Sequence, residues 1–183
     1  FSASQTVTAD MPRLGRSIDW TGATGSPTWS LGSVSTTIYG SLTLISGMTV
    51  SGASGFSYAG RSTYSITSSG KAMTGNQGFS CPGGTYTLQD AFNTSGSLSL
   101  TIGSLDLNNF SMTSTTMSSS NNNVRSITFG TGTWSLTSTA TATVWDFQNA
   151  NATLSGSNGT IAITGSSANN RTFAGGTSKT YGT

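Results

Sequence analysis

Carboxylates are the side chains of this sequence best suited to chemistry, and there are few of them. The chain of 183 residues has five Asp, no Glu and no His. Glycosidic hydrolysis needs two facing carboxyl groups, one protonated and one ionised, whereas Asp19, Asp90, Asp106 and Asp146 stand in different segments. A Ser-His-Asp triad lacks its His. We therefore predict no catalytic site and a non-enzymatic protein, with Asp90 in "LQDAF" capping backbone amides at a turn.

The sequence offers few residues that could bind a metal ion or a cofactor. The segment "DLNN" (residues 106–109) offers oxygen ligands, but it lacks the ligand spacing of a calcium loop. Cys81 is the only cysteine, so the chain has neither an internal disulfide nor a cage of thiolate ligands. We expect no metal and no cofactor.

Aromatic side chains are the remaining candidates for a binding site, because they can stack on sugar rings. Four of them take the place that Leu42 and Leu98 hold in a repeated strand pattern, which predicts that they lie in the core: Trp29, Tyr64, Tyr86 and Trp134. Trp145 in "TVWDF" lies outside that pattern and is the best candidate for an exposed contact with a glycan or a partner. Trp20 and Tyr58 are the further contact candidates.

Composition excludes two classes of partner. The chain has 34 Ser, 33 Thr and 24 Gly, against seven Lys and Arg and five Asp, for a net charge of +2. Nucleic-acid binding needs several clustered cations, and Arg13 and Arg16 are the only close pair. A membrane-spanning helix needs about 18 or more consecutive apolar residues, and no such run occurs. We therefore expect neither a nucleic-acid partner nor a membrane span.

One five-residue pattern recurs along the chain: a small residue, then Ser or Thr, an apolar residue, Ser or Thr, and an apolar residue. Successive side chains of a strand point to opposite sides, so each copy predicts a short strand with an apolar face and a hydroxyl face. Helices are not expected, since Ser, Thr and Gly are poor helix formers. The copies are "PTWSL" (27–31), "GSLTL" (40–44), "STYSI" (62–66), "GTYTL" (84–88), "GSLSL" (96–100), "GSLDL" (103–107), "GTWSL" (132–136) and "GTIAI" (159–163).

The spacing of these copies predicts how the strands are connected. Copies begin at residues 40, 62 and 84, 22 residues apart, and others at 96 and 103, seven apart. A coil explains both distances if seven residues pass one corner and roughly twenty complete a turn, which favours a parallel β-solenoid of eight or nine turns. The two phrases beginning at 40 and 96 would then lie on the same sides of the coil. The alternative is a β-sandwich or jelly roll, although its antiparallel hairpins favour Asn-Gly turns and only residues 158–159 supply one.

The chain is expected to form one all-β domain. Residues 1–26 form an N-terminal cap or the first turn, and residues 27–183 form the solenoid body. The polar run at 114–125 is expected to be a loop leaving one corner. Thr139, Thr141 and Thr143 alternate along one segment, but a threonine array that orders water should repeat on adjacent turns in one register, and the sequence does not show this clearly. The abrupt C-terminal end suggests a piece of a longer polypeptide.

Two segments of the sequence are distinctive, "GGTYTLQDAF" (83–92) and "TFAGG…KTYG" (172–182). In these, and over most of its length, the chain resembles the Ser/Thr/Gly-rich β-helical repeat proteins of environmental bacteriophages and bacteria. Those proteins are described as tail-fibre, virion structural or surface proteins. The resemblance implies a β-helical body in a virion appendage or on a surface, and it carries over no catalytic residue.

The combined expectation is a non-enzymatic structural module of a bacteriophage virion appendage or surface, such as a tail-fibre or spike shaft or a decoration protein, with a contribution to host attachment. The alternatives are a glycan-binding adhesin and a filament-forming subunit of a bacterial cell surface. Expected partners are other copies of the chain, as a trimer or a stack, neighbouring virion or surface proteins, and host surface glycans. The expected location is the virion, the cell surface or the extracellular space.

Overall fold

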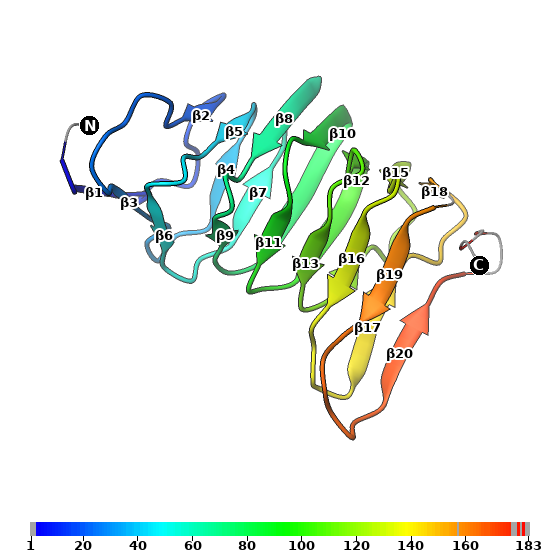
Figure 1. Ribbon diagram of the computed structural model, residues 1–183. Helices are drawn as coiled ribbons and strands as arrows, with labels where there is room; N and C mark the ends of the chain where they lie inside the picture. Colours follow the sequence, from blue (N-terminus) through cyan, green and yellow to red (C-terminus); the bar gives the residue numbers. More distant parts are fainter. Residues whose placement is uncertain (1–2, 157, 177–178, 180, 182–183) are drawn as a thin grey trace.

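The chain winds into a three-sided parallel β-solenoid (Figure 1). The computed structural model describes residues 3–156, 158–176, 179 and 181. The described residues contain twenty strands and no helix, as the prediction of an all-β chain requires. The first and last turns lie at opposite ends of the rod.

Three ladders of short strands form the three faces. β6 (Thr49–Ser51) and β9 (Ala72–Met73) adjoin on the first face but belong to different sheets. β10 (Gln77–Leu88) and β12 (Leu98–Asp106) pass a corner and join the second and third faces in one sheet. The first face contains β1 (Thr6–Thr8), β3 (Thr28–Ser30), β6 (Thr49–Ser51), β9 (Ala72–Met73), β11 (Phe92–Thr94), β13 (Met112–Ser114), β16 (Thr133–Leu136) and β19 (Thr160–Ile163). The second contains β4 (Thr36–Ile38), β7 (Phe56–Tyr58), the first parts of β10 (Gln77–Leu88) and β12 (Leu98–Asp106), β14 (Met117–Ser118), β17 (Ala142–Asp146) and β20 (Arg171–Ala174). The third contains β2 (Ile18–Asp19), β5 (Leu42–Thr43), β8 (Thr63–Thr67), the second parts of β10 and β12, β15 (Arg125–Thr128) and β18 (Ala152–Ser155).

Every strand pair among the described residues is parallel, which confirms the solenoid and excludes the sandwich of antiparallel hairpins. Each turn takes about 22 residues, and the described residues contribute eight strands to the first face and seven to each of the other two. The expectation of eight or nine turns rests on a constant turn length, whereas the later turns are longer. Tyr64 pairs with Tyr86, 22 residues on, whereas Met117 pairs with Trp145, 28 residues on.

The repeated phrases beginning at residues 40 and 96 do not lie on the same sides, so that part of the prediction was wrong. The copy at 40–44 supplies β5 on the third face, and the chain then continues to β6 on the first. The copy at 96–100 lies in the first part of β12 on the second face, and the copy at 103–107 lies around its second part on the third. The pattern therefore marks the strand after any corner rather than one particular side.

Inward side chains from successive turns pile into columns along the axis. Leu42, Ile66 and Leu88 occupy one column in register and are fully buried. On the second face the rings of Tyr58 and Phe79 stack with centroids 4.6 Å apart and planes inclined by 12°. Because each turn covers the apolar side chains of the next, a chain with 33% hydrophobic residues still forms a continuous core.

The polar run at 114–125 is more ordered than the expected loop. Its first part belongs to β13 and β14, which are separated by a bend at residue 115, and the remaining bends lie at residues 121–123. These bends are tied to the next turn, since Asn149 Nδ2 donates to the Asn121 carbonyl oxygen (2.6 Å) and Asn151 Nδ2 donates to that of Asn122 (2.7 Å). The run therefore forms a hydrogen-bonded corner.

Arg125 closes this corner from inside. Its side chain is 1% exposed and lies over the ring of Phe147. The guanidinium donates to the Asn123 carbonyl oxygen (2.7 Å) and to the hydroxyl and carbonyl oxygens of Ser119. A buried cation needs such acceptors to offset its lost hydration, so Arg125 is a structural residue.

Candidate functional site

The three aromatic residues expected as exposed contacts are buried. Trp145 and Tyr58 are fully buried and Trp20 is 6% exposed. The expectation that Trp145 is exposed was wrong because a register shift interrupts the alternation of β17. Thr143 pairs with Thr172 and Trp145 with Phe173, which leaves an extra residue between them. This bulge turns both Val144 and Trp145 inward.

Trp145 and Tyr58 are both integrated into the core by specific contacts. The indole of Trp145 stacks on Phe173 (6.0 Å, 7°), meets Trp134 edge to face (5.3 Å, 88°) and donates from Nε1 to the Tyr181 hydroxyl (3.1 Å). Tyr58 donates its hydroxyl to Gln77 Oε1 (3.4 Å), and burial raises its pKa well above 10. Neither ring is presented to a ligand.

Three of the four aromatic residues that the repeated pattern predicts in the core are buried. Trp29, Tyr86 and Trp134 are buried, which confirms the prediction for these three, and Tyr64 is half-buried against Tyr86 with ring centroids 5.6 Å apart. The polar atoms of these rings are also used internally. Tyr86 accepts a hydrogen bond from the backbone N–H of Gly60 (3.1 Å), and Trp134 Nε1 donates to Ser114 Oγ (2.9 Å).

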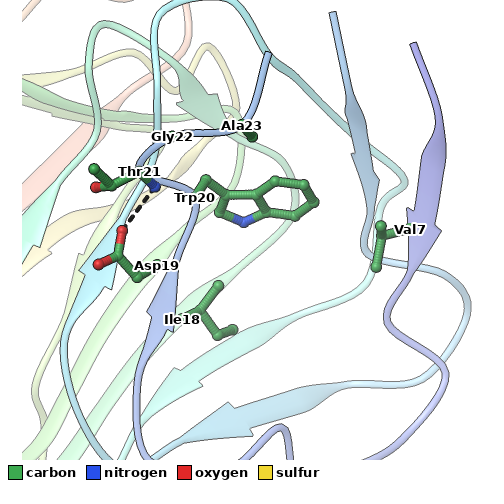
Figure 2. A pocket seen from close by; sticks show the side chains of 7 residues that line it. All are labelled: Val7, Ile18, Asp19, Trp20, Thr21, Gly22 and Ala23. Atoms are coloured by element: carbon green, nitrogen blue, oxygen red, sulfur yellow. Dashed lines mark hydrogen bonds between the residues drawn. The ribbon is translucent and has the colours of Figure 1, made fainter. Parts of the chain in front are cut away.

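Trp20 borders a pocket (Figure 2). The pocket has a volume of about 390 Å³ and lies in the first turn, with Val7 of β1 on one side and Ile18, Trp20 and Ala23 on the other. Asp19 lies at its edge and accepts a hydrogen bond from the Thr21 backbone N–H (2.8 Å). Hydrogen bonds from the Thr21 side chain and backbone lower the pKa of Asp19. The pocket is the open end of the core, walled by the apolar side chains of the first turn.

Two of the carboxylates, Asp90 and Asp106, hold turns. Asp90 accepts backbone N–H bonds from Ser68 (2.8 Å) and Ser69 (2.5 Å) of the preceding turn, which confirms its expected capping role. Asp106 accepts a bond from the N–H of Asn108 (2.9 Å). Across the described part of the chain, no three His, Cys, Asp or Glu residues gather as a metal site would require.

The outer side of the third face carries two rows of side chains in register over five turns, all of them hydroxyls except Asp106. Ser126 Oγ donates to Ser104 Oγ (2.7 Å), and the hydroxyls of Thr128 and Ser155 lie 3.0 Å apart. The first row consists of Thr63, Thr85, Ser104, Ser126 and Thr153, and the second of Ser65, Thr87, Asp106, Thr128 and Ser155. Of the alternating Thr139, Thr141 and Thr143, which the sequence did not clearly show as an array, Thr143 pairs in register with Thr172. The rows were missed because each turn contributes only two members.

Comparison with protein-family models, with curated proteins and with solved structures yields no match for this chain. Among the residues that the structure describes, no helix is long and apolar enough to cross a membrane. Proposals about function therefore rest on the fold and on the side chains that it presents.

Proposed function

We propose that this chain is a non-enzymatic structural module, a stiff shaft or decoration of a virion appendage or of a cell surface. The observation that carries the proposal is the combination of three parallel ladders around one continuous core. Each turn is bonded to the next along all three faces, apart from the break between β6 and β9. A rod of this kind resists bending and extension along its whole length.

The exterior supports the same role. Two rows of hydroxyls, interrupted by the carboxylate of Asp106, run along the third face, and only 7% of the residues are charged. Such a surface is well hydrated and has little long-range attraction for other macromolecules. That combination suits a spacer that must stay extended in a crowded exterior.

Immunogold electron microscopy of the native source tests this proposal. Antibodies against the chain should label a virion appendage or the cell surface, with purified protein blocking the label as the control. Label confined to the cytoplasm would overturn the proposal. Release of new reducing ends from surface polysaccharide by the purified chain would also contradict it.

We further propose that copies of the chain associate. β19 and β20 are the last described strands of their faces, and each carries a large apolar side chain that is 41% exposed, Ile163 and Phe173. Edge strands with exposed apolar residues favour pairing with another chain. Sedimentation velocity should show concentration-dependent oligomers, and Ile163→Lys should shift them toward monomer. A monomer at every concentration would refute this association.

A second candidate function is the ordering of water, which the two hydroxyl rows favour. Neighbouring turns repeat at about 4.8 Å and alternate residues of a strand at about 6.7 Å, so ten side chains form a regular array on the third face. The test is inhibition of ice recrystallisation. Thr85→Val with Ser126→Val should abolish the inhibition, and an inactive wild-type chain removes this candidate.

A further inference from the structure

Three of the seven cationic residues form an exposed group in the first turns. Arg13, Arg16 and Arg61 are exposed, and none of their side chains makes an ion pair or side-chain hydrogen bond within the described residues. An Arg without an internal partner contributes little to the stability of the fold. These three guanidinium groups are therefore available to a ligand.

The cations of the later turns behave differently. Arg125 donates to the carbonyl oxygens of residues 119 and 123, Arg171 donates to that of Gly165, and Lys179 donates to that of Asn149 (3.0 Å). Each of them thus binds the backbone of its own rod. The contrast separates structural cations in the last turns from unengaged ones in the first.

Winding of the chain places the unengaged arginines along one corner with two tyrosines. Tyr39 donates its backbone N–H to the Gly15 carbonyl oxygen (3.1 Å), which sets it beside Arg16. In the next turn a Cβ on Gly60 would meet the Tyr39 carbonyl oxygen (2.9 Å) and the ring of Tyr64, so Arg61 follows directly on the same corner.

Arg13 forms a parallel β-bridge with Thr37 of β4, which places Arg13 on the second face, one turn before β4. We call this group the arginine–tyrosine corner: Arg13, Arg16, Tyr39, Arg61 and Tyr64. It covers three successive turns where the second face meets the third, close to β4, β5, β7 and β8 (Figure 1), and thus about 10 Å of rod.

The side chains of the arginine–tyrosine corner combine two kinds of recognition. Guanidinium groups bind carboxylates and phosphates with paired, charge-assisted hydrogen bonds. Tyr39 is 37% exposed and offers a ring face for a sugar. Asp10 and Asp19 are the acids of the same turn; neither forms an ion pair with these arginines in the described residues, and Asp19 is bonded to Thr21.

We infer that the arginine–tyrosine corner binds an anionic polysaccharide through its carboxylate or phosphate groups. An extended polymer that follows the rod would meet Arg16 and Arg61 on turns one and three, with Tyr39 between them. Three cations are few for a nucleic acid, which is bound mainly by neutralising many phosphates. This binding goes beyond the structural role, because a shaft requires no ligand at this corner.

Biolayer interferometry with the immobilised chain tests the inference, with alginate as the anionic probe and dextran as the neutral one. Alginate should bind and weaken steeply as salt rises from 50 to 200 mM, while dextran should not bind. Arg16→Gln and Arg61→Gln should each weaken alginate binding about three- to tenfold. Arg61→Lys should fall between wild type and Arg61→Gln, because it keeps the charge and loses the paired hydrogen bonds.

Lys71→Gln is the matched control, since it removes one positive charge on another corner, between β8 and β9. It should leave alginate binding unchanged, and circular dichroism should confirm that every variant keeps its β-sheet spectrum. If Lys71→Gln weakened alginate binding as much as Arg16→Gln or Arg61→Gln, the loss would reflect net charge alone, and the inference would be overturned. It would equally be overturned if dextran, a single-stranded oligonucleotide or vesicles of anionic lipid bound as tightly as alginate.

Discussion

Replacing Trp145 by Ala distinguishes a core residue from a contact residue. The indole is fully buried among Trp134, Phe147 and Phe173 and bonded to Tyr181. Truncating a buried Trp to Ala costs about 3 to 5 kcal/mol through lost burial and the cavity left behind. For a chain of this size, 4 kcal/mol corresponds to a fall of about 8 to 16 °C in Tm. An exposed contact residue would change Tm by only a degree or two.

The assay is urea unfolding followed by circular dichroism, together with hydrogen exchange resolved by turn. Val124→Ala is the control, because Val124 is 75% exposed and its truncation should change stability by less than about 0.5 kcal/mol. Trp145→Ala should also accelerate exchange in β14, β17 and β20, which are the paired neighbours in its ladder. A loss below about 1 kcal/mol, or faster exchange spread evenly over all turns, would refute the burial argument.

Three further predictions concern other parts of the fold. Gly103 has φ 95° where β12 turns its corner, and a Cβ there would meet Cys81. Gly103→Ala should therefore lower the free energy of unfolding, measured in urea, by about 1 to 3 kcal/mol. An unchanged free energy of unfolding would contradict the argument that only Gly fits this corner. Burial raises the pKa of Tyr86 to about 12 and that of Tyr58 well above 10. The neutral form of Tyr86 therefore stabilises the fold below pH 10, and this contribution is lost as pH rises through about 12. Phenolate absorbance should rise together with the loss of circular dichroism, and full ionisation in a folded chain would contradict this. Arg125→Met should make residues 119–124 sensitive to limited proteolysis, since the carbonyl groups that it binds lose their donor, and wild-type resistance would contradict it.

The fold class could be predicted because short stretches of the sequence show both the alternation of side chains and the length of a turn. Period-two patterns specify strands, and the copies at 62 and 84 pair in register as Tyr64 with Tyr86. The copy at 40 lies on the same face but pairs two residues out of step, since Leu42 faces Ile66. Register depends on the exact length of each corner, and a spacing between motifs does not contain that information.

The placement of individual side chains was harder to predict for two reasons. A bulge breaks the alternation at Trp145, and nothing in "TVWDF" marks the extra residue. Tyr58 and Trp20, by contrast, alternate with Ser57 and Asp19 and follow the inward-facing Phe56 and Ile18, so strict alternation could have placed both in the core. The period-two alternation of a strand is sufficient to place these two residues, whereas the five-residue pattern does not include them.

The arginine–tyrosine corner shows what winding adds to a sequence. Arg13 and Arg16 are visible as a pair in the chain, but Tyr39 and Arg61 join them only because residues about 20 to 24 apart are neighbours in the coil. Residues on the faces must fit a ladder, which favours small hydroxyl side chains there. Arg16, Tyr39 and Arg61 lie between strands, at a corner where successive turns bring together side chains that are distant in the sequence.

The two ends of the rod should respond independently to mutation. Each turn of a solenoid contacts only its neighbours, and the arginine–tyrosine corner belongs to the first three turns, whereas Trp145 pairs with Met117 and Phe173 in the last ones. Trp145→Ala should therefore leave alginate binding unchanged at temperatures where the first turns stay folded, and Arg61→Gln should leave the unfolding of the last turns unchanged, since distant sites without shared partners contribute additively. Alginate should protect the first turns of Trp145→Ala against unfolding more strongly than the last turns. Equal protection of the first and last turns would mean that the rod unfolds as one unit, and it would refute the independence of the two sites.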